Sequence, residues 1–134
     1  NKNPSDVSVK LEVLTKTKCP RFHQDKVPVR LICTYVGPCT EWLNGYDSHH
    51  MVNNRSPPQI CNKEISRGRP SLQATPGDVL LLRGHEQSWS IGELSTIHNE
   101  HRIPGVAHRS PDLEEGQRRL VLTMDIGDTC GLSM

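Results

Sequence analysis

Strict alternation of apolar and polar residues is the feature that most constrains the fold of this chain. In the stretch VSVKLEVLT, which begins at Val7, apolar residues at positions 7, 9, 11 and 13 alternate with Ser8, Lys10 and Glu12. A period of two places each set on its own face of an extended strand, whereas an amphipathic helix needs a period of 3.6. No long stretch has the helical period, so the sequence predicts strands and little helix.

Turn-forming residues divide the chain into short segments. Ten glycines and ten prolines punctuate the sequence, and the segments PGDVLLLRG and RRLVLTMD are typical of strands next to a turn. The polar stretches 44–76 and 85–104 are predicted to be long irregular loops with one or two short strands at most. Many short strands separated by turns predict an all-β fold, either a sandwich or a barrel-like jelly roll.

The bulk properties of the chain exclude several classes of protein. Its 134 residues fit one domain, 1–134, and the lack of an initial methionine suggests a fragment of a longer protein. A formal net charge of +1 gives no electrostatic reason to expect nucleic acid or an anionic membrane as a partner. The mean hydropathy is −0.57, and no apolar run approaches the roughly 18 residues of a membrane-spanning helix. Five cysteines without a C-x-x-C pair favour the cytoplasm or another reducing intracellular compartment.

A histidine and an aspartate, His23 and Asp25, stand at the head of an apolar stretch, CPRFHQDKVPVRLICTYVG. Taken as one strand, this stretch carries both on its more apolar and therefore inward face, with Val27, Val29, Leu31, Cys33 and Tyr35. A buried carboxylate without a partner is costly, and a divalent metal would remove that cost. The alternative is that the two side chains simply hydrogen-bond each other.

A second histidine would complete a set of metal ligands. Two histidines and one carboxylate on one side of an ion form the facial triad of non-haem Fe(II) oxygenases. The missing histidine should lie near the start of a late strand, and His108 in GVAHRSP is the candidate. With His23 and Asp25 it would leave positions on the ion open for substrate and oxygen.

Arg118 follows His108 by ten residues and is the candidate anion anchor. On the predicted last strand, Arg118 shares a face with Leu120, Leu122 and Met124, and the opposite face ends in polar residues, so Arg118 should point inward. Its planar guanidinium suits the carboxylate of a 2-oxo acid, although an internal ion pair would also satisfy it. Tyr35 could hydrogen-bond the same acid or simply fill the core. Arg109, directly after His108, is the reserve candidate.

With His23, Asp25, His108 and Arg118 in this order, the chain resembles the Fe(II)/2-oxoglutarate-dependent dioxygenases. Their pattern is H-x-D, a distant histidine, and an arginine or lysine about ten residues later. The resemblance implies a double-stranded β-helix, a cupin-like jelly roll with long irregular loops. It also implies Fe(II) on the three ligands, 2-oxoglutarate held by Arg118 and Tyr35, and hydroxylation of an unknown small-molecule or protein substrate.

Four segments are similar to a largely bacterial family of unknown function, domain of unknown function family 1826. They are CPRFHQDKVPVRLICTYVGPCTEWL, PGDVLLLRG, AHRSP and QRRLVLTMD. The chain departs from this family at Cys39, where glycine is expected, and in extra residues before Gly105. The family name supplies no activity, so whether the chain is an enzyme stays open. A loose association of the family with zinc homeostasis leaves a zinc-binding, cupin-like module without oxygenase activity as the alternative. A jelly roll that keeps these residues only for packing or partner binding is a third possibility.

Overall fold

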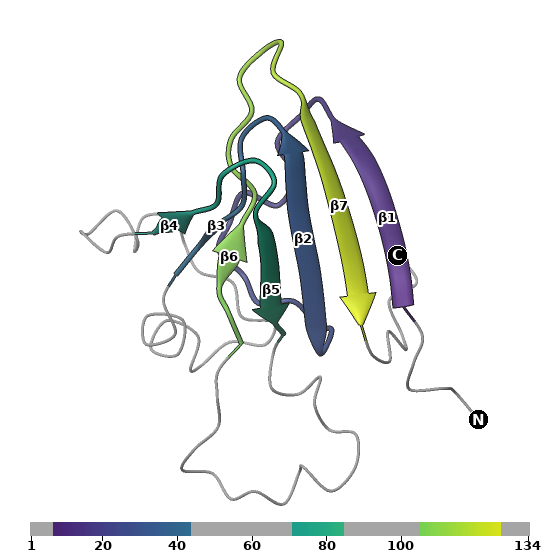
Figure 1. Ribbon diagram of the computed structural model, residues 1–134. Helices are drawn as coiled ribbons and strands as arrows, with labels where there is room; N and C mark the ends of the chain where they lie inside the picture. The colour runs from purple at the N-terminus through teal and green to yellow at the C-terminus, as the bar shows by residue number, and fades with distance from the viewer. Residues whose placement is uncertain (1–6, 44–70, 85–104, 127–134) are drawn as a thin grey trace, which may run out of the picture.

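The computed structural model describes residues 7–43, 71–84 and 105–126, and these form seven β-strands and no helix (Figure 1). The strands are β1 (Val7–Leu14), β2 (Val29–Val36), β3 (Glu41–Trp42), β4 (Leu72–Gln73), β5 (Val79–Arg83), β6 (His108–Arg109) and β7 (Arg119–Ile126). The expected all-β class is therefore confirmed for this part of the chain. Most of the two predicted loop regions lies outside the described residues. Within the described ranges, no helix exists that could cross a membrane.

Two antiparallel sheets make up the described structure (Figure 1). The larger has the strand order β1-β7-β2-β5, and the smaller has the order β4-β3-β6. An isolated bridge between His23 and His108 adds one extended residue beside β6. Side chains between the two sheets therefore come from both halves of the sequence.

The strand pairs are nested along the sequence. The first strand, β1, pairs with the last, β7; the bridge residue His23 pairs with β6; β2 pairs with β5; and β3 pairs with β4. The first half of the chain thus runs antiparallel to the second half as one long ribbon. The ribbon is itself folded over, so that strands from different parts of it become neighbours: β2 also pairs with β7, and β3 also pairs with β6. This nesting places His23 next to His108.

The inner face of the four-stranded sheet differs from the predicted one. Ile32, Leu82 and Val121 are buried and form a core cluster, and their neighbours along β2 and β7 face the other way. Leu31 is only half-buried, and the side chain of Tyr35 is 49% exposed. The predicted inward face of β2 is therefore wrong beyond Val27. The physical reason is a bend at residues 26–28, which shifts the phase of the alternation between the His-Asp segment and β2.

The predicted orientation of β7 is also wrong. Arg118 is exposed just before the strand, whereas Arg119 is 2% exposed and lies on the same inward face as Val121. The alternation along β7 marks Leu120, Leu122 and Met124 as the more apolar face, but this face lies opposite the buried cluster that contains Val121. The register against β1, which pairs Leu14 with Arg119, sets the orientation.

Gly84, at the end of β5, is in close contact with the segment that carries Asp25. Its amide donates to the carbonyl of Pro28 at 2.9 Å, and a Cβ added here would lie 1.6 Å from the carbonyl oxygen of Val27. Real atoms cannot approach so closely, so any side chain at this position must displace backbone. Glycine at position 84 therefore lets β5 support the loop before β2.

We predict that Gly84→Ala lowers the free energy of unfolding by at least about 3 kcal/mol, because the clash is with backbone that cannot move aside cheaply. Gly77→Ala is the matched control: Gly77 has a φ of +92° but nothing within 4 Å of an added Cβ. We expect it to cost only about 1 kcal/mol from its backbone conformation. Urea denaturation of both variants measures the difference, and equal losses would contradict the proposed contact.

Candidate metal centre

The structure brings the three predicted ligands, His23, Asp25 and His108, together between the sheets. Two backbone hydrogen bonds pair the histidines: His23 N donates to His108 O at 3.0 Å, and His108 N donates to His23 O at 2.9 Å. Asp25 follows two residues after His23, in the loop that leads to β2. One potential ligand atom from each residue lies within 4.8 Å of the other two. The distances suit three ligands of one metal ion.

The hydrogen bonds of the two imidazole rings orient their lone pairs. His23 Nδ1 lies 2.7 Å from the carbonyl oxygen of Arg21, and His108 Nδ1 lies 3.0 Å from that of Val106. A carbonyl oxygen only accepts, so each Nδ1 must carry the proton. In the neutral rings, both Nε2 atoms then hold a lone pair. Backbone acceptors on the second ring nitrogen are typical of histidines that bind metals.

These two Nε2 lone pairs face the carboxylate of Asp25. His108 Nε2 lies 3.1 Å from Asp25 Oδ2, and His23 Nε2 lies 3.5 Å from Asp25 Oδ1. Asp25 Oδ2 is buried and accepts no well-aligned hydrogen bond. Three electron-pair donors that face one another repel unless a cation lies between them. Either a proton on a ring or a metal ion can fill that role, and the orphaned Oδ2 fits a metal ligand.

The carboxyl group of Asp25 is buried, with its side chain 7% exposed. Burial raises its pKa, but the neighbouring His108 and His23 rings, which can carry a proton, and the nearby charge of Arg30 outweigh burial, so the pKa lies well below its usual range. Asp25 is therefore ionised at neutral pH. Burial lowers the pKa of His23, yet its hydrogen bonds with Asp25 and Arg21 O leave that pKa raised. Without a metal, His23 can thus supply the compensating proton.

Arg30 on β2 links Asp25 to a second carboxylate. Its Nη1 donates to Asp25 Oδ1 at 2.8 Å, while Nε and Nη2 donate to the two carboxylate oxygens of Asp125 at 2.6 and 2.9 Å. The Asp125 contact uses the planar fork of the guanidinium, which fixes its orientation. Arg30 therefore holds Asp25 Oδ1 and leaves Oδ2 directed at His108. Sequence analysis missed Arg30 and Asp125. Their opposite charges, on an early and a late predicted strand respectively, could have indicated an ion pair between these strands.

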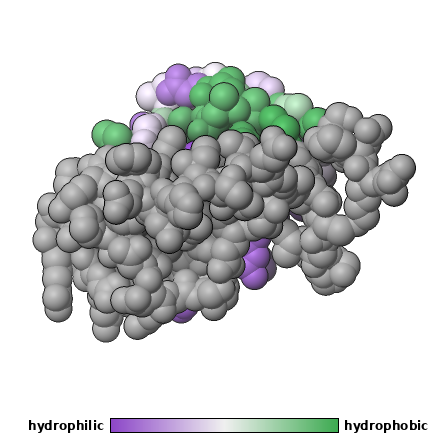
Figure 2. Space-filling model, turned by 90° about the horizontal axis from the view of Figure 1, so that it is seen from below, coloured by the Kyte–Doolittle hydropathy of each residue, from purple (hydrophilic) through white to green (hydrophobic). Residues whose placement is uncertain are grey.

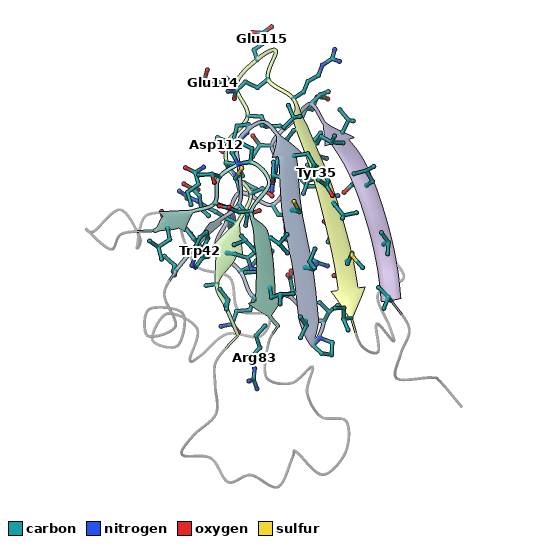
Figure 3. The ribbon with its side chains drawn as sticks, in the orientation of Figure 1. Tyr35, Trp42, Arg83, Asp112, Glu114 and Glu115 are labelled. Carbon is teal, nitrogen blue, oxygen red and sulfur yellow. The ribbon has the colours of Figure 1, made fainter. Side chains whose placement is uncertain are left out.

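The small sheet holds His108 in place. Opposite residues of an antiparallel pair share a face, so Trp42, which is labelled in Figure 3 and pairs with His108 in the register, lies on the same face of the small sheet as His108. On the other face, Arg109 Nε donates to Glu41 at 2.6 Å, and its guanidinium lies 4.4 Å from the centre of the Phe22 ring. Arg109, the reserve anchor, is thus engaged away from the three ligands.

The two predicted cosubstrate residues lie apart from the ligands. Arg118 is exposed, and Tyr35 is on the outer face of the sheet (Figure 3). The buried arginine is Arg119, which donates to Thr34 Oγ1 at 3.0 and 3.2 Å and to Thr40 Oγ1 at 2.6 Å. Burial lowers the pKa of its guanidinium, which still remains charged. In the described part of the chain, no carboxylate forms an ion pair with Arg119.

We predict that Asp125→Asn weakens binding of Zn²⁺ or Co²⁺ by about 10- to 100-fold, the usual effect of losing a partner that orients a metal ligand. The amide removes the charge and one acceptor for Arg30, which then holds Asp25 less firmly. Competition titration with a chromophoric chelator measures the affinity. Asp112→Asn, at an exposed position, is the control and should bind metal like the parent chain. Parental affinity in Asp125→Asn would contradict this role of Arg30.

Comparison with known proteins gives a family but no activity. No curated protein and no solved structure matches the chain significantly. A family model does match, over residues 2–125, and its description is "Protein of unknown function (DUF1826)". The match spans all three candidate ligands, both residues of the Arg30–Asp125 pair and Arg119. The resemblance inferred from four sequence segments is thereby confirmed, and the chain belongs to the DUF1826 family.

Proposed function

We propose that this chain is an Fe(II)- and 2-oxo-acid-dependent oxygenase-like protein that hydroxylates a substrate not yet identified. The observation that carries the proposal is the convergence of two histidine Nε2 atoms on the carboxylate of Asp25, whose Oδ2 is buried without a hydrogen-bond partner. Two histidines and one carboxylate, supplied by separate segments between two sheets, are the ligand set of the non-haem Fe(II) oxygenases.

The nested strand pairs support a jelly-roll assignment. If the bridge residue His23 counts as a short strand, eight strands pair first with last, second with seventh, third with sixth and fourth with fifth. Such a ribbon, folded into two sheets, is how a double-stranded β-helix is built. His23 and His108 would then lie on the second and seventh strands. This is the arrangement that we propose for the fold.

The surroundings of the ligands fit an ion with open positions. Arg30 occupies Asp25 Oδ1, so Asp25 would bind through Oδ2 alone. A six-coordinate ion held by one carboxylate oxygen and two imidazoles keeps three positions for other molecules. Fe(II) bound there would supply the oxygen chemistry. The residues of this chain would orient the ligands, and the sheets would limit access of water.

We place the anion anchor at Arg119 in the proposal, in place of Arg118. Arg119 is buried, charged and without a carboxylate partner among the described residues, and it donates hydrogen bonds to the hydroxyls of Thr34 and Thr40. A buried guanidinium with neutral partners favours an incoming anion. The distal carboxylate of a 2-oxo acid such as 2-oxoglutarate would meet Arg119, and its 2-oxo-acid end would meet the metal.

Zinc is the second candidate for the site. Two histidines and one carboxylate also suit a zinc ion, and the backbone acceptors on both Nδ1 atoms serve either metal. A zinc-binding module, however, would have no use for the buried charge of Arg119. That residue therefore separates the two readings experimentally.

We predict that anaerobic addition of Fe(II) and then 2-oxoglutarate produces a visible charge-transfer band. Arg119→Ala and the milder Arg119→Lys should raise the apparent Kd for 2-oxoglutarate by about 10-fold or more, because a charged hydrogen bond contributes about 1.5–3 kcal/mol. Arg118→Ala is the matched control: it removes the neighbouring but exposed guanidinium and should leave the titration unchanged.

The outcomes separate the candidates. A band that survives both Arg119 variants but weakens in Arg118→Ala would overturn the anchor assignment. Tight Zn²⁺ binding without any 2-oxoglutarate-dependent band would favour the zinc module. Thermal unfolding of each variant controls for loss of the fold, since Arg119 is buried against Thr34 and Thr40.

A further inference from the structure

The outer face of the four-stranded sheet is apolar across all four strands. The strand registers align its side chains in rows, and most belong to valine, leucine, isoleucine or methionine. We call this surface the outer sheet face; it consists of Val7, Val9, Leu11, Val13, Leu120, Leu122, Met124, Ile126, Val29, Leu31, Cys33, Tyr35, Val79, Leu81 and Arg83. Arg83, at one corner, is the single charged residue in the set. Hydrophobic side chains gather over this sheet in Figure 2.

Much of this face is in contact with solvent. Leu11 and Val13 on one edge strand are each 62% exposed, and Leu81 on the other edge strand is 66% exposed. Eight of its apolar residues are exposed: Val7, Val9, Leu11, Val13, Tyr35, Val79, Leu81 and Ile126. At these exposures they present on the order of 800 Å², more than the roughly 300–600 Å² of the largest patch on a typical monomer.

We propose that the outer sheet face is the interface of a homodimer, in which two copies of this chain pack face to face. The area supports a dimer, because about 800 Å² per partner is the size of a standard stable interface. Two sheets packed in this way lie about 10 Å apart, as in a β-sandwich. The proposal is independent of the metal centre, which lies against the opposite face of the sheet.

The charge of the face favours a second copy over a different partner. An interface that selects another protein normally carries charges that match it, and the outer sheet face carries one arginine at its corner. A uniformly apolar face complements itself, and a two-fold axis through the sheet would make each copy cover the other. The arginines of the two copies would lie at the rim, where water can solvate them. The remaining sequence offers no long stretch of 3.6 period that would cover the face as an amphipathic helix.

Sedimentation equilibrium between about 1 and 100 μM, with light scattering, tests the dimer. We expect the parent chain to sediment at twice its mass of 15.0 kDa. Leu11→Lys and Leu81→Lys each place a charge inside the interface and should weaken dimerisation at least 30-fold, or abolish it. Glu115→Lys, at the exposed turn before β7 (Figure 3), is the control that changes charge away from the face and should remain dimeric.

Circular dichroism identifies any variant that fails to fold, and metal titration of the monomeric variants shows whether the centre survives alone. A parent chain that is monomeric at about 100 μM would overturn the proposal, whether or not it binds a hydrophobic dye. A dimer that neither lysine variant weakens would place the contact elsewhere, for example at a sheet edge, and would also overturn it. Retained metal binding in the monomers would keep the proposed function separate from this result.

Discussion

The buried, ionised carboxylate of Asp25 is the constraint around which the described structure is arranged. A charge in that position needs partners, and the fold supplies them from three directions: two imidazoles on one side and a guanidinium on the other. Arg30 in turn needs a counter-charge, which Asp125 provides from β7. The resulting chain of charges joins the loop before β2 to two strands of the large sheet. Removal of any member would leave the next one without its partner.

Part of this arrangement could be predicted from the sequence. Alternation in the stretch after Val7 indicated strands. The pattern of two histidines and one carboxylate, His23, Asp25 and His108, indicated a single site, which requires a fold that brings the two distant segments together. The prediction of the inner face failed because the bend at residues 26–28 changes the phase of the alternation. It failed again at Arg118 because the more apolar face of β7, with Leu120, Leu122 and Met124, is the outer one, and the buried cluster lies on the face of Arg119 and Val121.

The outer and inner faces of the large sheet differ in composition. The more apolar face is turned away from the site, while the inner face combines Ile32 and Val121 with charged groups such as Arg30 and Arg119. Hydrophobic pattern is normally a guide to the core, and here it points to the surface instead. A strand with polar residues on its inner side is what a ligand site requires. The alternation therefore identifies the strands of this sheet but not the face that points between the two sheets.

The nested pairing also has a consequence for how the chain reaches its folded state. Val7 pairs with Ile126, so the first strand has no partner until the last strand has been synthesised. Contacts between such distant parts of a sequence slow folding, because a long loop must close before any bond forms. During translation, the histidine–aspartate half of the centre would leave the ribosome well before His108. The three candidate ligands can therefore come together only after the segment that carries His108 has been made and has paired with the segment that carries His23.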